Sequence, residues 1–233
     1  MLRRLKQIFR YFRNKSKFRH LKVKVSCKKK WFGNDYGGFY VNPILLNKES
    51  VVYSFGIGED ISFDLEMIEM FNLNVFGFDF TPRSIDWIKK NNISKNFKFF
   101  DYGIGIKSEN VKFYLPKNEN HVSGSLISQS NVKKSNSITV EVKSLTDIAN
   151  ENNHKVIDVL KLDIEGFEYE LFENINFTKL QINQILVEFH ERFFENGAEK
   201  TLKIINKLSL EGYEIFAISN SFEEISFIKV DLI

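Results

Sequence analysis

The chain has 233 residues, of which 43% are hydrophobic and 27% are charged, enough to bury one substantial core. No apolar run approaches the ~18 residues of a bilayer-spanning helix, and the basic N-terminus lacks the apolar segment of a signal peptide. Cys27 is the only cysteine, which excludes intramolecular disulfides and cysteine-based zinc sites and favours a cytoplasmic location.

Positive charge is concentrated in residues 1–30, which hold 13 of the 33 basic side chains and no acidic one. The rest of the chain is acidic, so we expect no nucleic-acid partner. Within this basic N-terminal arm or helix lies one apolar helical stripe, formed by Leu2, Leu5, Ile8, Phe9 and Phe12. Residues 1–22 are therefore candidates for peripheral contact with an anionic membrane, on its inner face. The alternative is a solvated helix that rests on the domain.

A single domain is expected over residues 48–233, because strand and helix patterns alternate there. Strands are predicted at 51–56, 74–79, 97–102, 156–162 and 183–189, and helices at 60–71, from Pro82, at 167–174 and at 198–210. An inserted substrate loop is expected at about 103–137, with extended runs at 111–115 and 138–142. Two final strands, 213–219 and 225–230, are joined tightly enough for a hairpin.

These elements predict an α/β fold: a seven-stranded, Rossmann-like sheet that is mostly parallel, with an antiparallel strand from the C-terminal hairpin. This arrangement is typical of methyltransferases that use S-adenosylmethionine (SAM), and it differs from that of dehydrogenases.

The first strand ends in Gly56 and Gly58, and Asp79 closes the second strand. Such a turn lets the backbone approach a nucleoside cofactor, and the acid can accept both ribose hydroxyls. Glu59 and Asp60 replace the rest of the dinucleotide fingerprint and would repel a pyrophosphate at a helix start. SAM, which is cationic and has no phosphate, is therefore favoured. The plainer interpretation is an ordinary strand–helix turn.

Further acids follow the other strands, where ligands bind in open α/β sheets. Asp101 closes the third strand and joins Gly56, Gly58, Glu59 and Asp79 as a predicted cofactor contact. Asp163 is predicted both to contact the cofactor and to act in catalysis, and His190 is the candidate general base. Glu165 and Glu188 are predicted substrate contacts, although Glu165 would also suit the first turn of a helix.

The inserted loop supplies further candidates for substrate binding, His121, Ser123 and Ser125. Asp163, Glu188 and His190 could also hold a divalent ion. Their spacing does not demand one, so no metal is expected.

Five segments together resemble the FkbM-type SAM-dependent methyltransferases, from about residue 50 to the C-terminus. They are Tyr-Ser-Phe-Gly-Ile-Gly-Glu-Asp (53–60), Phe-Asp-Phe-Thr-Pro-Arg (78–83), His-Val-Ser-Gly-Ser (121–125), Leu-Lys-Leu-Asp-Ile-Glu-Gly (160–166) and Val-Glu-Phe-His (187–190). The resemblance implies O-methylation of a sugar or another natural-product hydroxyl, often in surface-polysaccharide synthesis. It also implies that Gly56 and Gly58 pass under the methionine part of SAM, that Asp79 holds the ribose, and that Asp163 lies by the transferable methyl. Ser54 and Asp60 depart from common methyltransferase patterns.

The sequence thus predicts a SAM-dependent O-methyltransferase that acts on a small-molecule or glycan acceptor. Two alternatives stay open, a nicotinamide-dependent oxidoreductase and a non-catalytic binding module built on the same fold.

Overall fold

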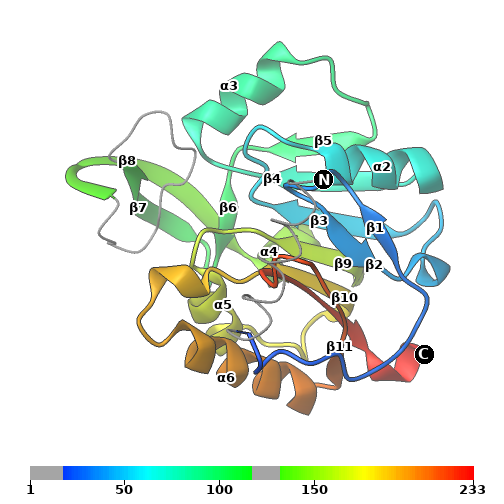
Figure 1. Ribbon diagram of the computed structural model, residues 1–233. Coiled ribbons are helices and arrows are strands. Elements are labelled where there is room, and N and C mark those ends of the chain that lie inside the picture. The colour runs from blue at the N-terminus through cyan, green and yellow to red at the C-terminus, as the bar shows by residue number, and fades with distance from the viewer. Residues whose placement is uncertain (1–17, 117–131) are drawn as a thin grey trace, which may run out of the picture.

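A computed structural model describes residues 18–116 and 132–233. Its centre is a seven-stranded sheet in the order β11-β12-β10-β9-β3-β4-β5 (Figure 1). The strands are β3 (Val51–Phe55), β4 (Asn74–Phe78), β5 (Phe97–Phe100), β9 (Val156–Leu162), β10 (Gln181–Glu188), β11 (Tyr213–Ile218) and β12 (Glu224–Lys229). The neighbours from β10 to β5 are parallel, and β12 is antiparallel to both β10 and β11. The predicted Rossmann-like sheet with an antiparallel C-terminal strand is confirmed.

Helices cover both faces of this sheet. One face packs against α2 (Ser62–Phe71) and α3 (Pro82–Lys90). The other packs against α4 (Leu145–Glu151), α5 (Glu168–Asn174) and α6 (Gly197–Leu210). Alternate residues of β3 serve the two cores: Tyr53 and Phe55 lie with α4 to α6, and Val52 lies with α2. A strand buried on both faces is mostly apolar because successive side chains point to opposite sides, and in β3 only Ser54 is polar.

Local sequence signals set several helix ends. α6 ends at Leu210 as predicted, and Gly212, which follows the C-cap Glu211, has φ +83°, a conformation that favours glycine. Pro82 occupies the first turn of α3, which begins there as predicted, and Thr81 precedes it. The Thr81 hydroxyl does not cap the helix. It donates instead to Asp79 Oδ1 at 2.7 Å.

The predicted insertion forms a small separate sheet at the side of the domain (Figure 1). Its strands are β6 (Gly103–Gly105), β7 (Glu109–Pro116) and β8 (Val132–Ser144), in the order β6-β8-β7. The described strands extend past the expected end at 137, because β7 pairs with β8 as far as Glu109 and Val142.

Residues before 48 also belong to the packed structure. A hairpin of β1 (Lys30–Phe32) and β2 (Phe39–Val41) buries Phe32, Phe39 and Val41 against the α2 face. Phe18 and Leu21 are buried in the core on the opposite face. The described part of the predicted arm therefore packs on the domain, because Phe18 and Leu21 are buried in one of its two cores.

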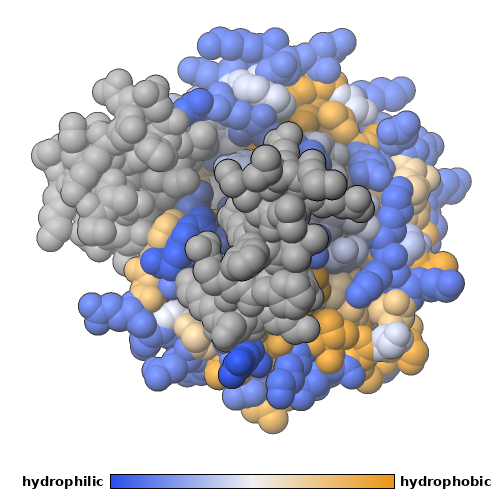
Figure 2. Space-filling model, viewed as in Figure 1, coloured by the Kyte–Doolittle hydropathy of each residue, from blue (hydrophilic) through white to orange (hydrophobic). Residues whose placement is uncertain are grey.

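Short 3-10 helices occupy Pro43–Leu45, Glu191–Phe193 and Val230–Leu232. Hydrophilic side chains cover much of the visible described surface, and hydrophobic ones gather toward the end that carries the C-terminus (Figure 2). In the two described ranges, every helix is too short or too polar to cross a bilayer.

Candidate functional site

A cavity of about 600 Å³ opens where β3 and β9 end. The strand order reverses between these two strands, since β4 and β5 continue on one side and β10 on the other. Ligands of open α/β sheets bind at such a switch point, and the volume suits a small-molecule ligand. The lining comes from the turn after β3, the ends of β4 and β9, the β1–β2 turn and the small sheet.

The glycines of the β3 turn have the backbone geometry that the sequence predicted. Gly56 and Gly58 have φ values of +79° and +57°, which L-amino acids with a Cβ rarely adopt. A Cβ on Gly56 would lie 1.7 Å from the carbonyl oxygen of Asp163. The turn thus passes directly against the end of β9, and only glycine fits there.

Asp79 fastens this turn. Its Oδ2 accepts hydrogen bonds from the amides of Ile57 (3.0 Å) and Gly58 (2.9 Å). Its Oδ1 accepts from the Thr81 amide (2.8 Å) and hydroxyl (2.7 Å). Asp79 also lines the cavity, so the carboxylate that the sequence assigned to a ribose shapes the glycine turn as well.

Two further acids lie on this wall. Glu59 Oε2 pairs with Arg83 Nη2 at 2.6 Å. Asp60 accepts from the Asn34 side chain at 2.5 Å and from the Ser62 amide at 2.8 Å. Both acids line the cavity. Asp101 is exposed and lies outside the lining, so the structure does not bring this predicted cofactor contact to the others.

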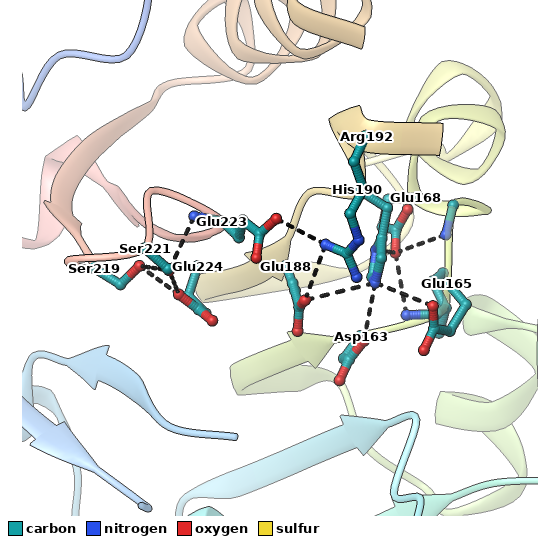
Figure 3. Close-up of polar contacts among 12 residues, drawn as sticks. Asp163, Glu165, Glu168, Glu188, His190, Arg192, Ser219, Ser221, Glu223 and Glu224 are labelled. Carbon is teal, nitrogen blue, oxygen red and sulfur yellow. Dashed lines mark hydrogen bonds and ion pairs between the residues drawn. The ribbon is translucent and has the colours of Figure 1, made fainter. Parts of the chain in front are cut away.

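On the neighbouring wall, at and beyond the end of β9, four carboxylates surround one imidazole (Figure 3). This histidine–carboxylate cluster consists of Asp163, Glu165, Glu168, Glu188 and His190. His190 Nδ1 lies 2.9 Å from Glu168 Oε1. His190 Nε2 lies 3.3 Å from Glu165 Oε2, 3.6 Å from Glu188 Oε1 and 3.7 Å from Asp163 Oδ1. Three predicted site residues, Asp163, Glu165 and Glu188, therefore converge on His190.

The electrostatics of the cluster follow from burial and crowding. Burial alone would lower the pKa of His190, but the charge and hydrogen bond of Glu168, with Asp163 and Glu188, raise it to about 10. Burial and the charge of Asp163 raise the pKa of Glu188 to about 9. The cluster therefore retains protons near neutral pH that isolated groups of these types would have released.

Access differs within the cluster. Asp163 and Glu165 line the cavity, whereas His190 and Glu168 lie behind them and are 1% and 0% exposed. Beyond Glu188, Arg192 Nη1 contacts Glu223 Oε1 at 2.8 Å and Glu188 Oε1 at 3.7 Å. Glu224 accepts hydrogen bonds from the Ser219 and Ser221 hydroxyls. The β11–β12 turn thereby borders this wall (Figure 3).

Three further residues belong to the site although they were not predicted from the sequence: Lys161, Glu168 and Arg192. Lys161 lines the cavity, and its Nζ donates to the Gly56 carbonyl at 3.4 Å. Its position two residues before Asp163 was a usable signal, because alternate residues of a strand share a face. Glu168 resembles an ordinary acid at a helix start, so its contact with His190 gave no local signal. His121, Ser123 and Ser125 lie outside the described residues.

A family model described as the methyltransferase FkbM domain matches residues 35–215. Among solved structures, the methyltransferase FkbM of Methylobacillus flagellatus is 12% identical with a TM-score of 0.49. The match covers 78% of this chain and 44% of that one, so this chain spans less than half the length of that protein. No curated protein matches the sequence.

Fibrillarins are also similar. The Methanococcus jannaschii pre-rRNA processing protein is 12% identical, with a TM-score of 0.45 and coverage of 90% of this chain and 86% of that one. The Aeropyrum pernix protein, solved with natively bound SAM, is 10% identical, with a TM-score of 0.41 and coverage of 88% and 83%.

Proposed function

The chain belongs to the FkbM methyltransferase family, and from this membership we propose that it methylates a hydroxyl of a sugar or related natural product. Membership confirms the predicted family and the predicted class, a SAM-dependent methyltransferase. The proposal adds the acceptor class, the residues that hold the two substrates, and the place of action, the cytoplasm.

One observation supports the placement of SAM: the glycine turn and Asp163 face the same cavity at the switch point of the sheet. The turn lets a ligand approach the backbone of Gly56 and Gly58, with Asp79 beneath it. Lys161 supplies a positive charge at the base of the turn, where it can attract the carboxylate of the methionine part. The small sheet adds Ile104 and Phe113, an apolar surface against which adenine can pack.

The acceptor belongs on the side of Asp163 and Glu165. Their carboxylates line the cavity and can accept hydrogen bonds from sugar hydroxyls. Of the two predicted proton acceptors, Asp163 suits the role better, because His190 is buried behind it and holds its own proton near neutral pH. His190 acts as a positioning residue. Much of the rate enhancement comes from aligning the hydroxyl with the methyl–sulfur bond.

Calorimetry with SAM and with S-adenosylhomocysteine tests the cofactor, and we expect both to bind at micromolar to sub-millimolar concentrations. NADH is the matched control, since a nicotinamide enzyme would bind it through the same turn. Failure of both SAM compounds to bind the folded protein contradicts the proposal. Binding without transfer to any glycan or sugar acceptor supports the alternative of a non-catalytic binding module.

A further inference from the structure

We propose that the histidine–carboxylate cluster binds one divalent metal ion, held by His190 Nε2 and by carboxylate oxygens of Asp163 and Glu165, and that the Nε2 proton is released to solvent as the ion binds. The ion's part in methyl transfer rests on the proposed function. Its binding rests on the geometry of the cluster alone.

The three donor atoms lie close to the separations of ligands that share an ion, and the distance from Nε2 to Glu165 Oε2 falls within that range. All three lie within 4.8 Å of one another, and Nε2 is 3.3 Å from Glu165 Oε2 and 3.7 Å from Asp163 Oδ1. Nitrogen and oxygen ligands lie about 2.0–2.2 Å from Zn²⁺ or Mg²⁺, so neighbouring ligands of one ion are about 3.0–3.6 Å apart. Both observed separations exceed the usual N–H···O hydrogen-bond distance of roughly 2.7–3.2 Å. The space between the donors therefore suits a small cation.

A second and independent observation is the orientation of the buried imidazole. His190 Nδ1 lies 2.9 Å from Glu168 Oε1, and that oxygen also accepts from the amides of Ile164 and Gly166 at 3.2 Å. Because Glu168 is 0% exposed, this contact is shielded from water and fixes the ring. Nε2 is thereby directed into the group of carboxylates. Metal-binding histidines usually have such a carboxylate partner on the other nitrogen.

The backbone after β9 is also shaped to bring Glu165 to the imidazole. Glu165 has φ +52°, in the left-handed region that residues other than glycine rarely occupy. Such conformations persist where the surrounding structure enforces them, and they concentrate at functional sites. Glu165 follows Asp163 by two residues. Its conformation turns the chain so that both carboxylates face His190 Nε2.

The negative charge of the carboxylates around His190 also favours a divalent cation. Asp163, Glu165 and Glu188 all lie within 3.7 Å of Nε2, and the nearby Arg192 makes its shorter contact with Glu223. A divalent cation would offset this excess of carboxylates. One imidazole with two or three carboxylates suits a transition-metal ion such as Mn²⁺ better than Ca²⁺. Since Asp163 and Glu165 line the cavity, the ion would lie where it can polarise the acceptor hydroxyl.

Titration of the full-length protein with Mn²⁺ in the absence of SAM tests the inference, because free Mn²⁺ gives a strong electron paramagnetic resonance signal that is lost on binding. We expect one equivalent to bind at micromolar concentrations. Glu165→Gln, which changes a partly exposed side chain, should weaken Mn²⁺ binding by about tenfold or more. The matched control Glu59→Gln removes the same charge from the glycine turn, where Glu59 pairs with Arg83, and should change the affinity by less than about twofold.

Two results overturn the inference: no Mn²⁺ binding by the wild-type protein at millimolar concentration, or equal weakening by Glu165→Gln and Glu59→Gln. Glu168→Gln supplies a second measurement, since loss of the orienting carboxylate should also weaken binding by about tenfold. Calorimetry with SAM on the same samples separates the two proposals. SAM binding without Mn²⁺ binding removes the metal and leaves the proposed function. Mn²⁺ binding without SAM binding removes the proposed function and leaves the metal site.

Discussion

On the glycine-turn side of the cavity, Asp79 accepts hydrogen bonds with both oxygens from the chain's own turns, and Glu59 is paired with Arg83. On the side of the histidine–carboxylate cluster, four carboxylates share one imidazole, and three of them lie 3.3–3.7 Å from its Nε2. The two walls contain similar acidic residues, yet their charges are balanced differently.

This difference suggests different roles for the glycine turn, the first wall, and the histidine–carboxylate cluster, the second wall: the first gives the cavity its shape, and the second binds a ligand. The polar groups of the first wall are satisfied by the chain itself, so the turn can hold its form before any ligand arrives. The second wall keeps carboxylates close together at the expense of stability, because crowded and partly buried charges are costly to hold. Such an arrangement is expected where a cation or a polar substrate completes the site.

The change that most severely tests the first wall is Gly56→Ala. The new Cβ would lie 1.7 Å from the Asp163 carbonyl and require φ +79° in alanine. We expect a loss of about 4 kcal/mol in the free energy of unfolding and no measurable SAM affinity. Gly37→Ala is the control, because its Cβ would come no nearer than 3.2 Å to the Asp60 carboxylate. Similar unfolding curves for both variants would show that the turn does not need to press against β9.

The matching change in the second wall is His190→Gln. It leaves the fully buried Glu168 without its charged partner, which should cost about 3 kcal/mol in chemical denaturation. Glu223→Gln alters a partly exposed pair with Arg192 and should cost less than about 1 kcal/mol. Equal losses would contradict the claim that the buried pair holds this wall together.

Alkaline pH should weaken the second wall in the wild-type protein. The folded-state pKa of His190, about 10, exceeds the unfolded value of about 6.5. Its stabilisation is therefore complete below about pH 6.5 and lost as the pH rises through 10. Glu188, with its pKa raised to about 9, changes stability in the same direction. Denaturation in the presence of a chelator should show stability falling from about pH 7 to pH 10, more steeply in the wild type than in His190→Gln. A flat profile would contradict the proposed protonation of the cluster.

Asp79→Asn sharpens the comparison with a smaller effect. Asp79 accepts two hydrogen bonds with each of its oxygens. In the asparagine variant one oxygen becomes an NH₂ group, which cannot accept them, so one pair of donors loses its acceptor. We expect a loss of about 2 kcal/mol in stability, with weaker SAM binding by calorimetry. Asp101→Asn, at an exposed position outside the lining, should change neither. An effect of Asp101→Asn on SAM affinity would restore it as a cofactor contact.

The smallest effect on the domain is expected from deleting residues that precede the described part of the chain. We propose that the basic residues 1–17 mediate peripheral membrane contact, and their deletion should alter the unfolding free energy by less than about 0.5 kcal/mol. Binding to anionic vesicles should disappear, and in the intact protein it should weaken with salt. Extending the deletion to residue 22 removes the buried Phe18 and Leu21 and should destabilise the domain. Failure of the intact protein to bind vesicles at low salt would end the membrane proposal.

Local patterns in the sequence predicted most of the central sheet. The runs at β3, β4, β9 and β10 lie within a residue or two of their predicted ends, because strands buried on both faces are rich in apolar residues. Gly56, Gly58 and Gly212 have the positive φ values that their neighbouring elements require. The strand-end acids were also visible, since ligand sites in such sheets follow the carboxyl ends of strands.

The sequence by itself determined the fold class and the strand end at which each acid lies, since the alternation of strands and helices orders the sheet. Only the tertiary structure decided what each acid does. Asp79 is held by backbone amides of two different turns, Asp101 lies outside the cavity, and Glu168 reaches His190 from 22 residues away. These outcomes depend on distances between segments that are remote in sequence. Burial and charge then act through those distances to set the protonation of the cluster.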